Sequence, residues 1–138
     1  MDIYAENILD HYRNPRNRSP LSPQERIGKD RPEDHQFMQY TENNPACGDE
    51  ITVGLDIQNT HVCTISWDGT GCAISQAAMS MLSEQFTGKS VEDIENFSTE
   101  DMLALLGVNL GPRRLKCALL GLDALKKAMK SHGAADED

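Results

Sequence analysis

The sequence is poor in aromatic residues and contains no long apolar run, no internal repeat and no C-x-x-C pair. Aromatic residues make up only 5% of the chain, so any core must be built mainly from aliphatic side chains. The uncharged apolar stretches fall well short of the roughly 20 residues that cross a bilayer, which argues against a membrane protein. The missing C-x-x-C pattern excludes the zinc-ribbon knuckle and the thioredoxin-like dithiol.

Positive charge is also scarce. The chain has 13 Lys and Arg residues against 22 Asp and Glu residues, which gives a formal net charge of -9. An acidic surface repels phosphate backbones and anionic lipid, so we expect neither nucleic acid nor a membrane as a partner. The first twelve residues carry acids where a signal peptide needs a basic start and an apolar run, so we expect a cytoplasmic protein.

The apolar content that is present suffices for one small domain. With 138 residues, of which 38% are hydrophobic, the chain fits a single compact core. We expect this domain to cover residues 1–130. Residues 131–138 (SHGAADED) read as an acidic disordered tail.

The hydrophobic periodicity predicts a helix, then strands, then helices. A helical pattern over residues 2–13 ends at Asn14-Pro15, and the proline-rich stretch 16–34 shows no sustained period, as expected of a surface linker. Alternation of apolar and polar residues over 35–67 predicts two or three antiparallel strands. A helical period returns after Gly71.

The helical half of the chain carries clear start signals. Ser90 and Ser98 are each followed three residues later by an Asp, which is typical of a capping box, and Pro112 suits the first turn of a final helix. The resulting order predicts an α+β domain in which helices pack on one face of a small antiparallel three-stranded sheet.

Three of the four cysteines fall at the ends of predicted elements. Cys47 precedes the first long strand, Cys72 opens a helix, and Cys117 lies near the start of the last helix, where thiolates are favoured. Together with Asp49 they would supply three sulfurs and one oxygen, a set that suits zinc or a small iron–sulfur cluster. The alternative is that Cys72 and Cys117 are small buried hydrophobic residues.

Four short segments carry a resemblance to a known family. They are residues 10–17 (DHYRNPRN), 44–49 (NPACGD), 71–75 (GCAIS) and 115–120 (LKCALL). In this order they closely resemble the iron–sulfur cluster assembly scaffold family, which comprises IscU, SufU and the N-terminal domain of NifU.

The resemblance implies an IscU/NifU-N-like fold with a ligand set at one end. Cys47, Cys72 and Cys117 would hold iron or a [2Fe–2S] cluster, with Asp49 as an exchangeable oxygen ligand, because a carboxylate binds cluster iron less firmly than a thiolate. The implied protein is a non-enzymatic scaffold that accepts sulfur at Cys117 from a cysteine desulfurase and serves apo iron–sulfur acceptor proteins. Cys63 has no counterpart in the family pattern, and we expect it to be structural.

One departure concerns the residue before the last cysteine. IscU-type members carry a His there, whereas this chain has Lys116, as SufU-type members do; residues 71–75 are also of the SufU type. The charge of Lys116 could steady a thiolate or persulfide. A SufU-type, zinc-dependent sulfurtransferase that activates a desulfurase is therefore an alternative function, and a purely structural zinc module is another.

A second departure lies in residues 110–116 (LGPRRLK). Only fragments remain of the segment that IscU-type members present to an Hsp70-type chaperone, so we do not expect chaperone dependence. Arg113 and Arg114 form a local basic spot, which fits a solvated helix start or, alternatively, a docking point for an acidic partner.

Overall fold

A computed structural model describes residues 3–19, 35–45 and 48–137, with only the backbone described at residues 3–5 and 131–137. The expected order of one helix, three strands and further helices is confirmed. The elements are α1 (Ile3–Arg13), β1 (His35–Asn44), β2 (Asp49–Gln58), β3 (His61–Thr70), α3 (Ala73–Phe86), α4 (Val91–Glu95), α5 (Thr99–Leu106) and α6 (Pro112–Glu137).

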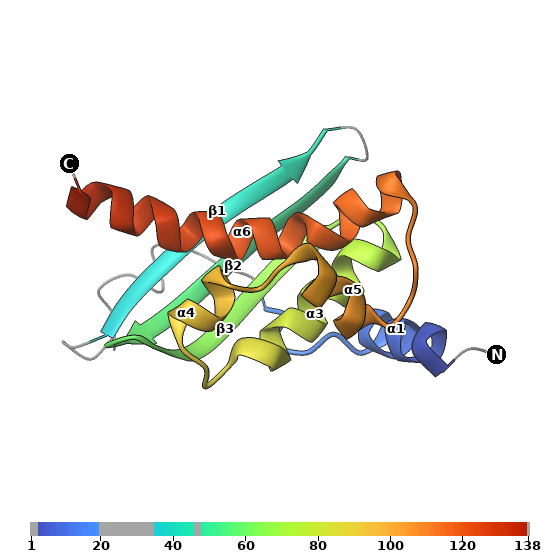
Figure 1. Cartoon of the computed structure of the whole chain (residues 1–138), viewed down its shortest axis with the longest axis horizontal. Helices are drawn as coiled ribbons and strands as arrows, with labels where there is room; N and C mark the ends of the chain where they lie inside the picture. The colour runs from blue at the N-terminus through green and yellow to red at the C-terminus, as the bar shows by residue number, and fades with distance from the viewer. Residues whose placement is uncertain (1–2, 20–34, 46–47, 138) are drawn as a thin grey trace.

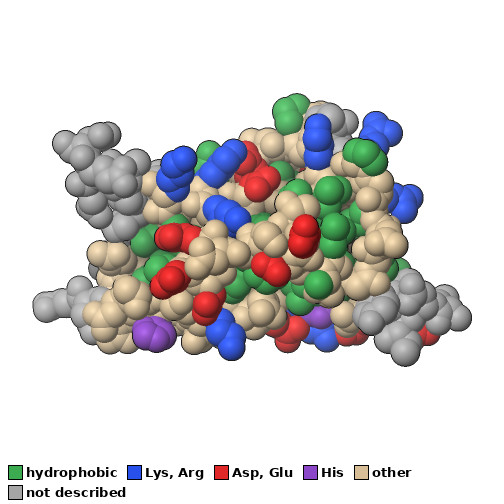
Figure 2. Space-filling view, in the orientation of Figure 1, with side chains coloured by type: hydrophobic (Ala, Val, Ile, Leu, Met, Phe, Trp, Pro, Cys, Tyr) green, Lys and Arg blue, Asp and Glu red, His purple; other side chains and the backbone are tan. Residues whose placement is uncertain are grey.

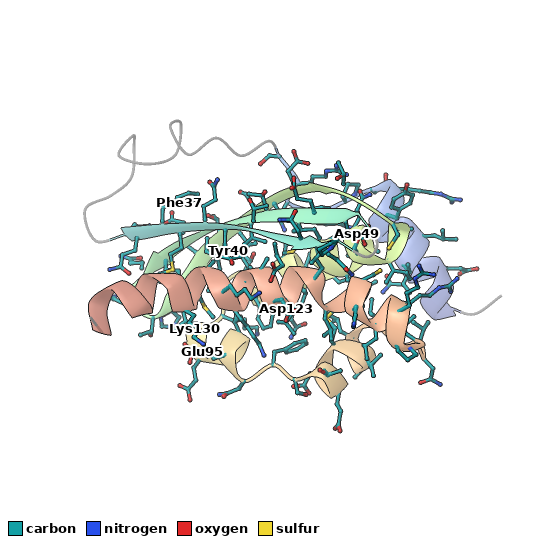
Figure 3. All side chains as sticks on the ribbon, turned by 90° about the horizontal axis from the view of Figure 1, so that it is seen from above. Phe37, Tyr40, Asp49, Glu95, Asp123 and Lys130 are labelled. Carbon is teal, nitrogen blue, oxygen red and sulfur yellow. The ribbon has the colours of Figure 1, made fainter. Side chains whose placement is uncertain are left out.

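The strands form one antiparallel sheet in the order β1-β2-β3, covered by helices on one face (Figure 1). Helix α6 packs along β1 and β2, α3 packs against both β3 and α6, and α1 packs against α3. The two short helices α4 and α5 contact α6 from the side away from the sheet (Figure 3). This arrangement confirms the predicted α+β class.

The alternation in β2 creates the face on which the helices pack. Ile51, Val53, Leu55 and Ile57 are all at most 2% exposed, because every second side chain of a strand points to the same face. On β1, Phe37 and Tyr40 point to opposite faces, and Tyr40 is on the side of α6 (Figure 3). The core therefore lies between the sheet and the pair α3 and α6.

The alternation predicted for β3 is wrong at Cys63. The sequence pattern places Cys63 on one face with Ile65 and Trp67, but Val62 is fully buried there and Cys63 is only half-buried. Asp56 pairs with Thr64 while Ile57 pairs with Val62, which leaves Cys63 as an extra residue in β3. Such a bulge reverses which side chains face the core.

Two predicted helix starts are confirmed at atomic detail. In α4 the hydroxyl of Ser90 accepts the backbone N–H of Asp93, and the Asp93 carboxylate accepts the N–H of Ser90 in return. Ser98 and Asp101 form the same reciprocal pair at α5. Each pair satisfies two backbone donors that a helix start otherwise leaves without partners.

The first residues of the expected surface linker pair with β3 instead. The backbone N–H of Ser19 donates to the carbonyl of Trp67 (2.9 Å), and the N–H of Trp67 donates to the carbonyl of Asn17 (3.2 Å). The guanidinium of Arg18 stacks over the Trp67 ring, with Cζ 5.2 Å from the ring centroid. Proline content alone gives no signal for this pairing. The rest of the expected linker, residues 20–34, lies outside the described residues.

The last helix runs beyond the expected end of the domain. Its backbone is helical to Glu137, past residue 130. The expectation of an acidic disordered tail over residues 131–138 stays a prediction. Among the helices of the described ranges, none combines the length and the apolar character that crossing a bilayer requires.

Candidate metal centre

Asp49 and Cys72 come together because of the pairing of β2 and β3. Asp49 is the first residue of β2, and Glu50 pairs with Thr70 at the end of β3, so the chain reaches Cys72 directly beside Asp49. The Asp49 carboxylate is 3% exposed and accepts the backbone N–H of Cys72 at 3.1 Å. Figure 3 shows Asp49 at the end of the sheet nearest α1, on the side facing the helices.

A glycine makes this close approach possible. Gly71 has a φ of +143°, and a Cβ at this position would lie 2.4 Å from Oδ1 of Asp49. Any side chain there would displace the carboxylate, because real Cβ atoms do not approach another heavy atom so closely. The carbonyl of Gly71 accepts from Nε2 of Gln76 (2.8 Å), whose Oε1 in turn accepts from Arg18 (2.8 Å).

Cys72 is the exposed thiol of the site. It caps the N-terminus of α3 with extended backbone and makes no side-chain capping bond. Its Sγ lies 3.6 Å from Oδ2 of Asp49 and 3.7 Å from Oγ of Ser75. The thiol is therefore next to a carboxylate and a hydroxyl while remaining open to solvent.

Cys117 is on α6, which packs against both β2 and α3, and it is only 5% exposed. One ligand atom from each of Asp49, Cys72 and Cys117 lies within 4.8 Å of the others. Ligand atoms around a tetrahedral zinc or cluster iron stand roughly 3.3–3.8 Å apart, so a small contraction would bring these three onto one ion. Two sulfurs and an oxygen are donors that zinc and cluster iron accept.

The two remaining cysteines are Cys47, a predicted ligand, and Cys63, which we expect to be structural. Cys47 lies outside the described residues, two positions before Asp49 in the sequence. Cys63 does not belong to the group of three.

An open cavity of about 500 Å³ surrounds the three ligand groups. It is lined by Asp49, Gly71, Cys72, Ala73, Ile74, Arg113, Arg114 and Cys117. Lys116 does not line this cavity. It lines a separate one of about 330 Å³ between β1 and α6, together with Glu42 and Asp123. Among the described residues, the positive charge that lines the thiol cavity thus comes from the two arginines and not from Lys116.

Sequence reasoning did not assign the arginines to the site, although a signal was present. Arg113 and Arg114 precede Cys117 by four and three positions, and residues at these spacings share one face of a helix. Lys116 precedes it by one position and points elsewhere. Helical spacing therefore identifies the residues that share a face with Cys117, whereas adjacency in the sequence does not.

The sequence of this chain is similar to the sequences of known proteins. The model of the family described as "NifU-like N terminal domain" matches residues 3–137. The "Zinc-dependent sulfurtransferase SufU" of Bacillus subtilis is 31% identical, over 92% of this chain and 89% of the relative. The "Iron-sulfur cluster assembly scaffold protein IscU" of Aquifex aeolicus is also 31% identical, over 94% of this chain and 75% of the relative.

A solved structure shares the fold. The crystal structure of a nitrogen-fixing NifU-like protein (N-terminal) from Brucella abortus superposes with a TM-score of 0.67 and 20% identity, covering 93% of this chain and 92% of that one.

Proposed function

The chain belongs to the NifU-like N-terminal domain family, and on this premise we propose that it is an iron–sulfur cluster assembly protein. It accepts sulfur from a cysteine desulfurase, builds or carries a [2Fe–2S] cluster, and passes the cluster to apo iron–sulfur proteins. The observation that carries this proposal is the convergence of Asp49, Cys72 and Cys117, from three separate elements, to within 4.8 Å. Cys47 is the proposed fourth ligand.

Cys117 is the proposed sulfur acceptor. Its thiolate attacks the outer sulfur of the desulfurase persulfide, a new S–S bond forms on Cys117, and the desulfurase cysteine leaves as a thiolate. Because Cys117 is 5% exposed, the persulfide must reach into the cavity beside Arg113 and Arg114. The cluster or metal is cargo in this scheme, and the chain supplies the ligands.

Asp49 is the proposed release ligand. Its carboxylate is the hardest donor of the set and exchanges faster than a thiolate on soft metal or cluster iron. Replacing Asp49 with Ala should leave sulfur acceptance largely intact but slow the hand-over of a cluster to an apo-ferredoxin. Asp49→Asn is the matched variant, because it retains an acceptor for the N–H of Cys72. Faster cluster release from Asp49→Ala than from the parent protein would contradict this role.

The ligand assignment is tested by reconstitution under exclusion of oxygen. Serine variants at positions 47, 72 and 117 should each lose the visible cluster, whereas Cys63→Ser should retain it, because Cys63 is the bulged residue of β3 and stands outside the group. Loss of the cluster in Cys63→Ser, or its retention in Cys72→Ser, would overturn the assignment. The readout is iron and sulfide content together with the absorption spectrum.

Zinc-dependent sulfur transfer is the second candidate function. The 31% identity to the SufU of Bacillus subtilis favours it, and the ligand set suits zinc as well as iron. Stoichiometric zinc together with a large stimulation of desulfurase turnover would favour this function. Transfer of a reconstituted cluster to apo-ferredoxin would favour the assembly scaffold.

A further inference from the structure

The cavity at the metal centre has walls of three chemical kinds. Sulfur and carboxylate come from Cys72, Cys117 and Asp49, an apolar wall comes from Ala73 and Ile74, and positive charge comes from the two arginines of α6. A metal ion alone needs only the first of these. The apolar wall and the cationic rim together fit an organic ligand that carries an anionic group.

Neither arginine of the rim pairs with an acidic side chain of the described residues. Arg113 and Arg114 are exposed, and in the ranges that the structure describes no carboxylate forms an ion pair with either of them. Arg16 and Arg18, by contrast, pair with Asp10 at 2.6 Å and Asp68 at 3.0 Å. Two adjacent guanidinium groups that no described carboxylate pairs with can hold a carboxylate of a ligand.

The helix surface that bears these arginines is basic more widely. From Pro112 to Lys130, α6 carries six Lys and Arg residues and one acidic residue, Asp123. Figure 2 shows basic side chains along α6, at the top of the view, and acidic side chains gathered lower down over α4 and α5. An anion is therefore attracted to the α6 side of the molecule, where the thiol cavity opens.

The exposures of the two thiols decide which one an entering molecule meets. Cys72 is exposed, whereas Cys117 and Asp49 are at most 5% exposed. A small molecule whose anionic end is held by the arginines would thus present its other end to Cys72. The buried thiol of Cys117 lies within 4.8 Å of the same point.

We propose that this cavity binds low-molecular-weight sulfur compounds that carry a carboxylate, with the carboxylate held by Arg113 and Arg114 and the sulfur presented to Cys72. The inference rests on the proposed function and gives the site a second source of sulfur besides a desulfurase. The Cys72 thiolate attacks the outer sulfur of a small persulfide, and an S–S bond forms on Cys72. The S–S bond of the donor breaks, and the donor leaves as a thiolate. No oxidant or reductant is required.

The test compares two disulfides that differ in charge. The full-length chain, freed of metal and checked for native circular dichroism, is treated with 3,3'-dithiodipropionate, a dicarboxylate, or with the neutral bis(2-hydroxyethyl) disulfide. Mass spectrometry of peptides gives the rate at which each forms a mixed disulfide on Cys72. In the Arg113→Gln/Arg114→Gln variant the ratio of the dicarboxylate rate to the neutral rate should fall roughly three- to tenfold, as expected for two exposed ion pairs. The ratio cancels any change in the reactivity of the Cys72 thiolate that the loss of the two charges causes. The fall should shrink at high salt.

Lys116→Gln is the matched control for the single variants Arg113→Gln and Arg114→Gln, because it removes one positive charge from the same helix at a residue that lines the other cavity. It should leave the ratio of the two rates near the parent value. The proposal is overturned if the double variant keeps the parent ratio, or if Lys116→Gln lowers it as much as the single arginine variants do. Single variants give the same comparison if the double variant does not fold. Metal binding by the parent protein is measured separately. A parent protein that binds no metal would refute the proposed function, whereas an unchanged ratio of rates in the double variant would refute only the binding of carboxylate-bearing sulfur compounds.

Discussion

At the scale of single residues, the centre depends on one buried carboxylate that has two roles. Asp49 accepts the backbone N–H of Cys72 and also lies 3.6 Å from its sulfur. The hydrogen bond fixes the start of α3, and the second oxygen is available as a ligand. The residue that permits this contact is Gly71, and it has no ligand role of its own.

Replacing Gly71 with Ala should weaken metal binding. The added methyl group would lie 2.4 Å from Oδ1 of Asp49, so the carboxylate must move out of the ligand group. We expect at least a tenfold loss of zinc affinity, a change of about 1.4 kcal/mol, measured by competition with a chromophoric chelator.

Gly88→Ala is the matched control for this substitution. Gly88 also has a positive φ, +87°, but a Cβ there meets no atom within 4 Å. Both variants should lose roughly 1–3 kcal/mol of folding stability through backbone strain. Equal zinc affinity in the two variants would show that the contact with Asp49 does not matter.

At the scale of elements, α1 is fixed to α3 through a buried histidine. Nδ1 of His11 lies 2.7 Å from Oγ of Ser80, which also accepts the backbone N–H of Arg16 at 2.9 Å. Nε2 of the same imidazole lies 3.6 Å from Oε1 of Glu84. Burial and the nearby Arg16 charge hold the pKa of His11 below its usual 6.5, although Glu84 and Asp10 oppose the shift.

This histidine predicts a loss of stability in mild acid. Below about pH 6.5 the unfolded chain binds a proton at His11 that the folded chain does not bind until its lower pKa is reached. Folding stability should therefore fall as the pH drops through this window, by up to about 1.4 kcal/mol per pH unit. Urea unfolding at pH 7 and pH 5.5 measures the change.

His11→Asn should lose less stability than the parent protein over the same pH interval, because it removes the titrating group. His61→Asn, at an exposed hairpin position, should follow the parent. The same pH dependence in His11→Asn as in the parent would refute the role of this histidine.

The helices and strands also show which features of the fold local sequence patterns predict. The capping boxes at Ser90 and Ser98 and the alternation in β2 are local patterns, and the structure agrees with them. The bulge at Cys63 and the pairing of Asn17 and Ser19 with Trp67 depend on contacts between distant segments, and no local period predicts them. Arg113 and Arg114 are an intermediate case. Their spacing predicts that they share a helix face with Cys117, but only the folded structure shows that this face lines the thiol cavity.

At the scale of the whole molecule, the centre exists only when the sheet, α3 and α6 are assembled. The core that assembles them contains none of the three ligand residues: buried aliphatic residues of β2 and β3 pack against α3 and α6. Burial of this kind supplies most of the free energy of folding.

We therefore expect the metal-free chain to remain folded. After chelation and dialysis, it should keep its far-ultraviolet circular dichroism and unfold cooperatively on heating. Added zinc should raise the melting temperature of the parent by ligand linkage, and this rise should be absent in Cys72→Ser. Unfolding on removal of metal would instead identify a structural zinc module.

Under the proposed function, the group at Asp49, Cys72 and Cys117 carries a metal or cluster cargo. The most direct test is the metal and sulfide content of protein isolated from cells without exposure to oxygen. We predict iron with equimolar acid-labile sulfide, in which case the chain carries a cluster, or one zinc per chain, in which case it is a zinc-dependent sulfur carrier. Protein that contains neither metal, or that keeps its metal when Cys72 is replaced by Ser, would contradict the account.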